Sequence, residues 1–303
     1  MSVYNAYMTL SGTIDADVVL NERLAHRTSL RIGGPAALGI TAHTYPALVR
    51  AIEVLTRSEV EWVILGRGSN LLVADAGYQG CVIRLGREFS RISMGEGGEV
   101  SVGAGTLLSK LVTTVQKAGL SGLEPCVGIP GTVGGAISMD AGTAKEWIGP
   151  HVSTVVTYRP GAGLTAHDGA AIEWGYRYCS LDPAEIILEA NFSLVPADPA
   201  AIAQDMAERM ARRQERQPIG RPTCGSVFKN PPGGSAAALV ESCGLKGQSS
   251  GAAQVSELHA NFIVNNGGAR ATDVLTLMRR MHDAVMRTHG IDLEPEVKYL
   301  GFA

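Results

Sequence analysis

Two glycine-rich stretches, each placed after a short apolar run, most constrain what this chain can fold into. Residues 66–70 read Gly-Arg-Gly-Ser-Asn, and residues 128–136 read Gly-Ile-Pro-Gly-Thr-Val-Gly-Gly-Ala. Glycine lets the backbone turn tightly or approach a ligand closely, and it makes up 37 of 303 residues. Either stretch alone is more simply a turn, because neither is a Walker loop or a Rossmann fingerprint. Together they predict backbone N–H groups arranged around a nucleotide-type cofactor.

Length and composition exclude several classes of protein. A chain of 303 residues predicts about two domains, and 45% apolar with 18% charged residues excludes a disordered chain. The net charge of −3 argues against a nucleic-acid binder. The sequence contains no apolar window of about 18 residues, so we expect no membrane span. The first residues do not have the pattern of a secretory signal, and we expect none. We therefore expect a cytoplasmic protein.

The cysteines and histidines do not predict a metal centre. Five cysteines, without C-x-x-C spacing, indicate free thiols rather than a disulfide framework or a zinc site. No H-E-x-x-H motif is present, and the spacing of His282 and His289 does not suit a helical zinc pair. We expect no metal.

Hydrophobic periodicity predicts alternating helices and strands. The predicted helices cover residues 45–58, 107–117, 199–216, 236–243 and a segment that is capped by Thr272 and ends at His289. The predicted strands cover residues 62–65, 81–85, 99–102, 152–158, 186–194, 226–228, 260–264 and 297–301. Residues 128–142 are expected to form a long turn-rich segment. Pro218, Gly220 and Pro222 mark a break near a domain boundary.

Several polar residues outside the glycine stretches are candidates for chemistry. Arg177, between two tyrosines, can hold a carboxylate, although a surface arginine stacked on tyrosine is the simpler interpretation. Ser226 lies close to Lys229 and Asn230, a group that can orient an anionic substrate or simply form a turn. Ser226 is not in a G-x-S-x-G elbow, which argues against an acyl-transfer serine.

A second group of candidates lies further toward the C-terminus. Gln254, His259 and Asn261 surround an apolar strand, where a lone histidine is usually structural. The predicted strand should direct Glu296 into the domain, and a buried carboxyl can donate a proton if burial raises its pKa. A solvated turn is the alternative, and it suits Glu294 better.

Taken in order, these stretches resemble the UDP-N-acetylenolpyruvoylglucosamine reductase (MurB) family. The resemblance runs from about residue 31 to residue 301. It depends on residues 65–70, 128–136, 175–177, 224–231, 251–255, 259–263 and 293–297. Each motif alone is weak, whereas the whole set in this order is highly specific. The direct run from Arg177 to the strand at residue 186 resembles the shorter of the family's two subtypes.

The resemblance implies an α+β protein. It implies a FAD-binding domain of the vanillyl-alcohol-oxidase (PCMH) type in two lobes, over residues 31–197, after an N-terminal segment over residues 1–30. A smaller α/β substrate-binding domain would follow over residues 198–303. The implied partners are FAD, NADPH as reductant and a UDP-sugar substrate. The sequence does not fix the oligomeric state, and a monomer is compatible with it.

The resemblance also assigns residues. FAD is expected to contact Gly66, Arg67, Gly68, Ser69, Asn70, Gly128, Ile129, Pro130, Gly131, Thr132, Gly134, Gly135 and Ala136. Arg177, Ser226 and Glu296 fall on the family's catalytic positions, and substrate is expected to contact Lys229, Asn230, Gln254, His259 and Asn261. Asp140 and Arg67 depart from the common pattern, since an asparagine and a small or acidic residue are usual there.

The implied reaction is the reduction of UDP-N-acetylglucosamine enolpyruvate to UDP-N-acetylmuramate in peptidoglycan synthesis. Hydride would reach the enolpyruvyl methylene carbon through FAD, and Ser226 would protonate the α-carbon. Two alternatives stay open. One is another FAD-linked oxidoreductase of a hydroxy acid or alcohol on the same flavin domain, and the other is a catalytically idle sugar-nucleotide-binding protein.

Overall fold

The computed structural model describes residues 2–143 and 145–302, which form two compact units. Unit 1 comprises residues Met1–Leu20, Leu38–Arg67 and Gly80–Ala211, and unit 2 comprises Asn21–Ala37, Gly68–Gln79 and Arg212–Ala303. These units are not contiguous in sequence, whereas the predicted domains are. The physical reason is burial, because Leu30, Ile32 and Leu72 belong to the hydrophobic core of unit 2.

The first sheet has the order β1-β2-β5-β3. Its strands are β1 (Ala16–Arg23), β2 (Pro35–Ala42), β5 (Tyr78–Leu85) and β3 (Trp62–Ile64), and the last two pair in parallel. Helices α1 (Val3–Leu10) and α2 (Tyr45–Arg57) contact each other, and their apolar faces share one core with this sheet. Thr44 caps α2 by accepting from Ala47 N, and Pro46 lies in its first turn. The helix predicted over residues 45–58 is confirmed.

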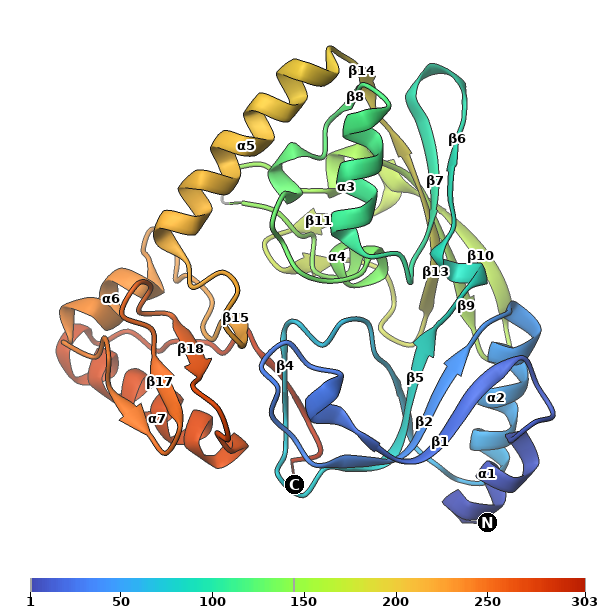
Figure 1. Ribbon diagram of the computed structural model, residues 1–303, viewed down its shortest axis with the longest axis horizontal. Helices are drawn as coiled ribbons and strands as arrows, with labels where there is room; N and C mark the ends of the chain where they lie inside the picture. The colour runs from blue at the N-terminus through green and yellow to red at the C-terminus, as the bar shows by residue number, and fades with distance from the viewer. Residues whose placement is uncertain (1, 144, 303) are drawn as a thin grey trace. The chain divides into compact units, whose positions relative to one another are not determined.

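The second sheet of unit 1 has the order β10-β9-β13-β7-β6 (Figure 1). The strands are β6 (Ile92–Met94), β7 (Glu99–Gly103), β9 (Val152–Arg159), β10 (Gly163–Asp168) and β13 (Ile186–Ser193). All neighbours run antiparallel. In the central strand Ala190 pairs with Val155 on one side and Val102 on the other. This sheet, with helices α3 (Leu108–Lys117) and α4 (Val133–Ser138), encloses a second core, so unit 1 contains two lobes as expected.

Helix α4 corrects the prediction of a continuous turn-rich segment over residues 128–142. Thr132 caps the helix, because its hydroxyl accepts from Gly135 N at 3.4 Å. Gly134 is used for close packing rather than for a turn, since a Cβ there would lie 3.0 Å from the Cβ of Ala104. Gly134, Gly135 and Ala136 are therefore helical, whereas Gly128 and Gly131 have positive φ values of 74° and 148°.

Unit 2 is built on an antiparallel sheet with the order β15-β18-β17-β16. Its strands are β15 (Thr223–Ser226), β16 (Ser249–Ser250), β17 (Ala253–Val255) and β18 (Phe262–Asn265), and they share a core with helices α6 (Ala236–Ser242) and α7 (Ala271–His289). The strand predicted over residues 226–228 is wrong in its bounds, because β15 ends at Ser226. In the same unit β19 (Lys298–Leu300) pairs in parallel with β4 (Leu71–Val73).

The remaining elements are short except for one long helix. Helix α5 (Pro199–Arg216) begins at the predicted residue and has only Ile202 buried. The short strands are β8 (Leu120–Ser121), β11 (Trp174–Gly175), β12 (Tyr178–Cys179) and β14 (Val195–Pro196). Within the part of the chain that is described, every helix is too short or too polar to cross a bilayer.

The start of α7 corrects a second prediction. Arg270, not Thr272, is the N-cap residue, and Asp273 accepts from Arg270 N at 2.9 Å. Asp75 lies 196 residues away in sequence and accepts from Ala271 N at 2.7 Å and from Thr272 N at 3.2 Å. A distant carboxylate therefore satisfies the first two backbone N–H groups of α7. Gly290 ends the helix in the left-handed conformation, as predicted.

We expect Asp75→Ala to destabilise unit 2 by about 1 kcal/mol, because it removes the cap of two backbone N–H groups. Thr272→Ala is the matched control and should be nearly neutral, since this side chain does not cap α7. Chemical denaturation of the two variants measures the difference. Equal losses for the two variants would contradict the assignment of the cap to Asp75.

Candidate functional site

The two glycine stretches meet at Gly66 and Thr132 in unit 1. A Cβ at Gly66 would lie 2.6 Å from Thr132 Oγ1, the same oxygen that caps α4. Gly66 and Gly135 are exposed, and Ile129 and Gly131 are half-buried. Glycine at position 66 is thus required because the two stretches pack closely together, and it leaves backbone that can approach a ligand closely. These residues fit the flavin nucleotide that the sequence predicts.

The end of the first stretch belongs to unit 2. Gly68 is buried with φ 62°, and a Cβ there would lie 2.5 Å from the carbonyl oxygen of Arg27. Asn70 Nδ2 donates to the backbone oxygen of Glu296 at 3.0 Å. Asn70, predicted to contact FAD, is therefore also tied to the segment that bears a predicted catalytic carboxylate.

Arg177 lies in the two-residue turn between β11 and β12. Trp174 pairs with Cys179 and Gly175 with Tyr178, so the hairpin presents Tyr176 and Arg177 at its tip. Arg177 has a φ of 60°, which is uncommon for a residue other than glycine. Its guanidinium carbon lies 5.2 Å from the centre of the Tyr176 ring, a cation–π contact. Arg177 therefore does stack on a tyrosine, as in the simpler of the two interpretations of this motif. It is half-buried in this position.

Ser226 and Glu296 lie on neighbouring segments of unit 2. Glu296 N donates to Val227 O at 2.9 Å, Lys229 N donates to Glu294 O at 2.8 Å, and Phe228 bridges to Pro295. This pairing places the two predicted catalytic residues on adjoining backbone. Glu296 is only 7% exposed, which contradicts a solvated turn at this position.

The hydroxyl of Ser226 is available to a ligand. Ser226 is half-buried at the end of β15, after Gly225 with φ 82°. Over residues 2–143 and 145–302, no side-chain hydrogen bond of Ser226 is found. A partly buried hydroxyl without a protein partner can donate to or accept from a substrate.

Three of the residues predicted to bind substrate hold the backbone of unit 2. Asn261 is 2% exposed, and its amide accepts from Phe228 N at 3.1 Å and donates to Phe228 O at 2.8 Å. Asn230 Oδ1 accepts from Ala236 N at 3.0 Å, and Gln254 Nε2 donates to Gly247 O at 3.1 Å. Their substrate contacts stay a prediction, but each has a structural partner that the sequence did not indicate.

Lys229 and His259 also have partners. Lys229 forms an ion pair with Glu294, a carboxylate that is 69% exposed. His259 stacks edge-on with Phe262 at 4.6 Å between ring centres, and its Nδ1 accepts from Asn261 N at 3.3 Å. Burial lowers the pKa of His259, and the positive charge of Lys246 lowers it further. The structural interpretation of this histidine is thus supported by its contacts.

The structure contains all five cysteines within its described residues, and none of these is in a disulfide. Cys224 lies beside Ser226 in sequence and is 2% exposed. Burial raises its pKa to about 12. A thiol with this pKa stays protonated near neutral pH and is a poor nucleophile.

We therefore expect Cys224 to resist alkylation in the native protein at pH 8, whereas the half-exposed Cys243 reacts. Peptide mass mapping after iodoacetamide treatment measures both sites in one sample. The same treatment in denaturant is the control and should label both. Rapid native labelling of Cys224 would contradict its burial.

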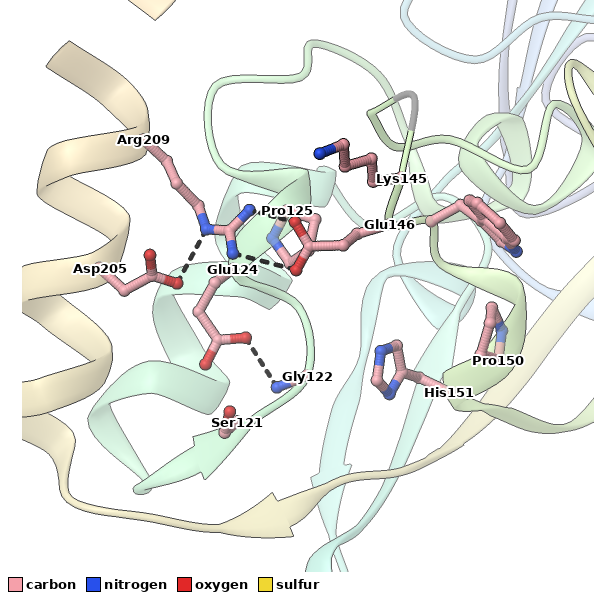
Figure 2. A pocket seen from close by; sticks show the side chains of 11 residues that line it. Ser121, Gly122, Glu124, Pro125, Lys145, Glu146, Pro150, His151, Asp205 and Arg209 are labelled. Atoms are coloured by element: carbon pink, nitrogen blue, oxygen red, sulfur yellow. Dashed lines mark hydrogen bonds and ion pairs between the residues drawn. The ribbon is translucent and has the colours of Figure 1, made fainter. Parts of the chain in front are cut away.

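One cavity in unit 1 escaped the sequence analysis. It measures about 390 Å³, and its charged lining residues are Glu124, Lys145, Glu146, His151, Asp205 and Arg209. In Figure 2 Arg209 on α5 reaches Glu146 through two hydrogen bonds, at 2.7 and 3.0 Å, and Asp205 at 2.8 Å. The hydrogen bond from Arg209 lowers the pKa of Glu146. None of the predicted site residues lines this cavity, and Arg209, Glu146 and Asp205 satisfy one another within it.

Comparison with known families places these features in a protein class. Residues 36–159 match the family model described as "FAD binding domain". Residues 217–300 match that of "UDP-N-acetylenolpyruvoylglucosamine reductase, C-terminal domain". The place where the two glycine stretches meet, at Gly66 and Thr132, therefore lies within a FAD-binding domain. The class of protein is a two-part flavoprotein of α+β fold.

Relatives with assigned names resemble the chain over almost its whole length. The UDP-N-acetylenolpyruvoylglucosamine reductase of Geobacter sulfurreducens is 40% identical over 96% of this chain and 97% of its own. That of Syntrophotalea carbinolica is 39% identical over 97% of this chain and 98% of its own. The crystal structure of the Thermus caldophilus reductase (MurB) matches with a TM-score of 0.81 and 40% identity, over 94% of this chain and 98% of that one. The chain belongs to the UDP-N-acetylenolpyruvoylglucosamine reductase (MurB) family.

Proposed function

We propose that this protein reduces UDP-N-acetylglucosamine enolpyruvate to UDP-N-acetylmuramate, with NADPH as reductant and FAD as cofactor. The reaction would serve peptidoglycan precursor synthesis in the cytoplasm. Family membership and the FAD-binding domain support the reaction class. The observation that carries the residue assignment is the half-buried Ser226, whose hydroxyl has no partner among the described residues and which lies next to the paired segment that buries Glu296.

The substrate is an enol ether conjugated to a carboxylate, so charge control is central to its reduction. The chemistry that bound FAD would supply is hydride transfer, with NADPH as the source and the terminal methylene carbon as the acceptor. Negative charge then develops on the carboxylate side of the substrate. Arg177, with its permanent positive charge, would stabilise this charge.

Glu296 would act as a hydrogen-bond donor to the charge that develops on the substrate. In the proposed reaction its carboxyl is protonated, because a protonated carboxyl can donate to an oxygen that gains charge. The backbone around it is fixed, because Glu296 N donates to Val227 O and Asn70 holds its carbonyl oxygen. This fixed backbone limits the reorganisation needed as the charge forms.

Ser226 would complete the reaction by donating a proton to the α-carbon. An alkoxide would remain on Ser226, and a serine is a poor acid without groups that stabilise this charge. The ammonium of Lys229 and the amide of Asn230 lie three and four residues further on. We propose that they, with groups of the substrate, provide this stabilisation.

The test is product analysis with purified flavin-loaded protein, NADPH and the enolpyruvyl sugar nucleotide in D₂O. We expect UDP-N-acetylmuramate with deuterium at the α-carbon, because an exchangeable hydroxyl supplies that proton. NADH in place of NADPH is the control for the choice of reductant. Flavin loading without product from this substrate would contradict the proposed reaction. If the protein then oxidised a hydroxy acid or alcohol, that result would favour the alternative of another FAD-linked oxidoreductase. If it showed no turnover at all, that result would favour the catalytically idle sugar-nucleotide-binding protein.

A further inference from the structure

Arg177, in the turn of its hairpin, and Asp140 both have a strained backbone. Asp140 and Arg177 have φ values of 41° and 60°, and they are two of five non-glycine residues with positive φ in the described parts of the chain. Such conformations cost energy and persist where the surroundings hold them, often at functional sites. Both residues belong to unit 1, and Asp140 follows α4 closely.

Asp140 is a buried carboxylate with one backbone partner. Asp140 is 4% exposed, and its Oδ1 accepts a hydrogen bond from Gly149 N at 2.9 Å. A buried carboxylate is costly unless hydrogen bonds and a positive charge compensate it. One hydrogen bond compensates only part of this cost, and a nearby cation would reduce it further.

Gly149 connects Asp140 to the base of the hairpin. A Cβ at Gly149 would lie 2.5 Å from Cδ2 of Trp174, so this backbone packs directly on the indole ring. Trp174 is the first residue of β11, and its Nε1 donates to Gly169 O at 3.0 Å. Helix α4 also contacts β12, the other strand of the hairpin. The segment that bears Asp140 therefore supports both strands between which Arg177 lies.

The charges of Asp140 and Arg177 also interact. Burial raises the pKa of Asp140, while the hydrogen bond from Gly149 and the positive charge of Arg177 lower it. On the neighbouring strand, burial raises the pKa of Cys179, and the charge of Asp140 adds to this effect. Asp140 thus lies within electrostatic reach of the hairpin tip as well as against its base.

We propose that Asp140 is a positioning residue that holds the guanidinium of Arg177 in the orientation needed to meet the carboxylate of the substrate. It does so through its charge and through the Gly149–Trp174 contact at the hairpin base. The inference rests on the proposed function, in which Arg177 stabilises that carboxylate. Asp140 itself would touch neither substrate nor cofactor.

A double-mutant cycle tests the proposal on the flavin-loaded enzyme. Asp140→Asn keeps an acceptor for Gly149 N–H and removes only the charge. We expect Asp140→Asn to slow flavin reoxidation by substrate about tenfold, in the range of couplings between contacting groups. Flavin content and the rate of flavin reduction by NADPH should stay near those of the parent. Arg177→Ala should slow reoxidation about 10²–10³-fold, and adding Asp140→Asn to it should cost nothing more.

Binding of the product gives a readout that is independent of turnover. Calorimetry with the oxidised enzyme should show weaker binding of the carboxylate-bearing product in Asp140→Asn, and this effect should vanish in the Arg177→Ala background. The matched control is Glu124→Gln, since Glu124 is another buried carboxylate of unit 1 that accepts a backbone N–H, from Gly122 at 2.7 Å. This control should leave both readouts unchanged.

The outcomes separate two kinds of failure. If the reductions in reoxidation rate caused by Asp140→Asn and Arg177→Ala multiplied in the double mutant, the positioning role of Asp140 would be overturned. The role of Arg177 would stay intact. An unimpaired Arg177→Ala enzyme would overturn the proposed function of Arg177 and this inference with it. If Asp140→Asn takes up no flavin, Trp174→Phe replaces it in the cycle, because it disturbs the same hairpin base. If Trp174→Phe and Arg177→Ala reduced the rate of flavin reoxidation by factors that multiply in the double mutant, that result would also overturn the inference.

Discussion

Ser226→Ala is expected to leave flavin reduction by NADPH nearly normal and to slow flavin reoxidation by substrate about 10²–10³-fold, the typical cost of removing a transition-state donor. The reason is that the Ser226 hydroxyl is proposed to supply the proton to the α-carbon, a step that follows reduction of the flavin. Anaerobic stopped-flow spectroscopy at the flavin band measures both half-reactions separately.

Ser249→Ala is the matched control for this variant. Ser249 lies on β16 of the same unit and is exposed, so its removal should change neither half-reaction. The melting temperatures of the two variants show whether a loss comes from folding. Reoxidation of the Ser226→Ala enzyme at the rate of the parent would eliminate Ser226 as the proton donor.

Glu296→Ala is expected to give the second large loss, again about 10²–10³-fold in reoxidation of the flavin by substrate. The carboxyl is buried on backbone that pairs with the segment after Ser226, so a water molecule would not reproduce its position. Glu296→Gln keeps a donor N–H group and should recover part of this activity. The same stopped-flow measurement is made on the parent, Glu296→Ala and Glu296→Gln.

Glu294→Gln is the control for Glu296, since the two glutamates flank Pro295. Glu294 is 69% exposed and pairs with Lys229, and an exposed ion pair of this kind contributes at most about 1 kcal/mol. We expect its rates to stay within about fivefold of the parent, the equivalent of that energy. Equal losses at Glu294 and Glu296 would contradict a specific role for the buried carboxyl.

The helices and strands with strong local patterns could be predicted from the sequence. Helix α2 has an apolar stripe, a threonine cap and an early proline, and all three signals are local. Helix α1 was missed, although Ser2 before Ala6 and Leu10 offers a cap and a helical spacing that could have indicated it. Helix α4 was missed because glycine disfavours helices, whereas the cap at Thr132 was a usable signal.

Long-range contacts could not be predicted from local patterns. The carboxylate that caps α7 comes from Asp75, and the strand β4 beside β19 comes from the same N-terminal part of the chain. No periodicity links such distant segments. For the same reason the sequence assigned residues 68–79 to the flavin domain, although Leu72 lies in the core of unit 2.

The candidate site could be predicted only in part. The order of motifs proposes Ser226, Glu296 and Arg177 as catalytic residues, which stays a prediction. The predicted burial of Glu296 is confirmed. The backbone partners of Asn261 and Asn230, and the contacts of Asp140, depend on how loops pack. These contacts follow from tertiary structure, where each buried polar group must find a partner.

The most direct test of the central claim is an anaerobic titration of the wild-type, flavin-loaded protein followed at the flavin absorption band. NADPH should bleach this band, and the colour should return only when the enolpyruvyl sugar nucleotide is added, with UDP-N-acetylmuramate formed in equal amount. UDP-N-acetylglucosamine without the enolpyruvyl group should leave the flavin bleached. A flavin that NADPH does not bleach, or that stays bleached after addition of the enolpyruvyl substrate, would contradict the account.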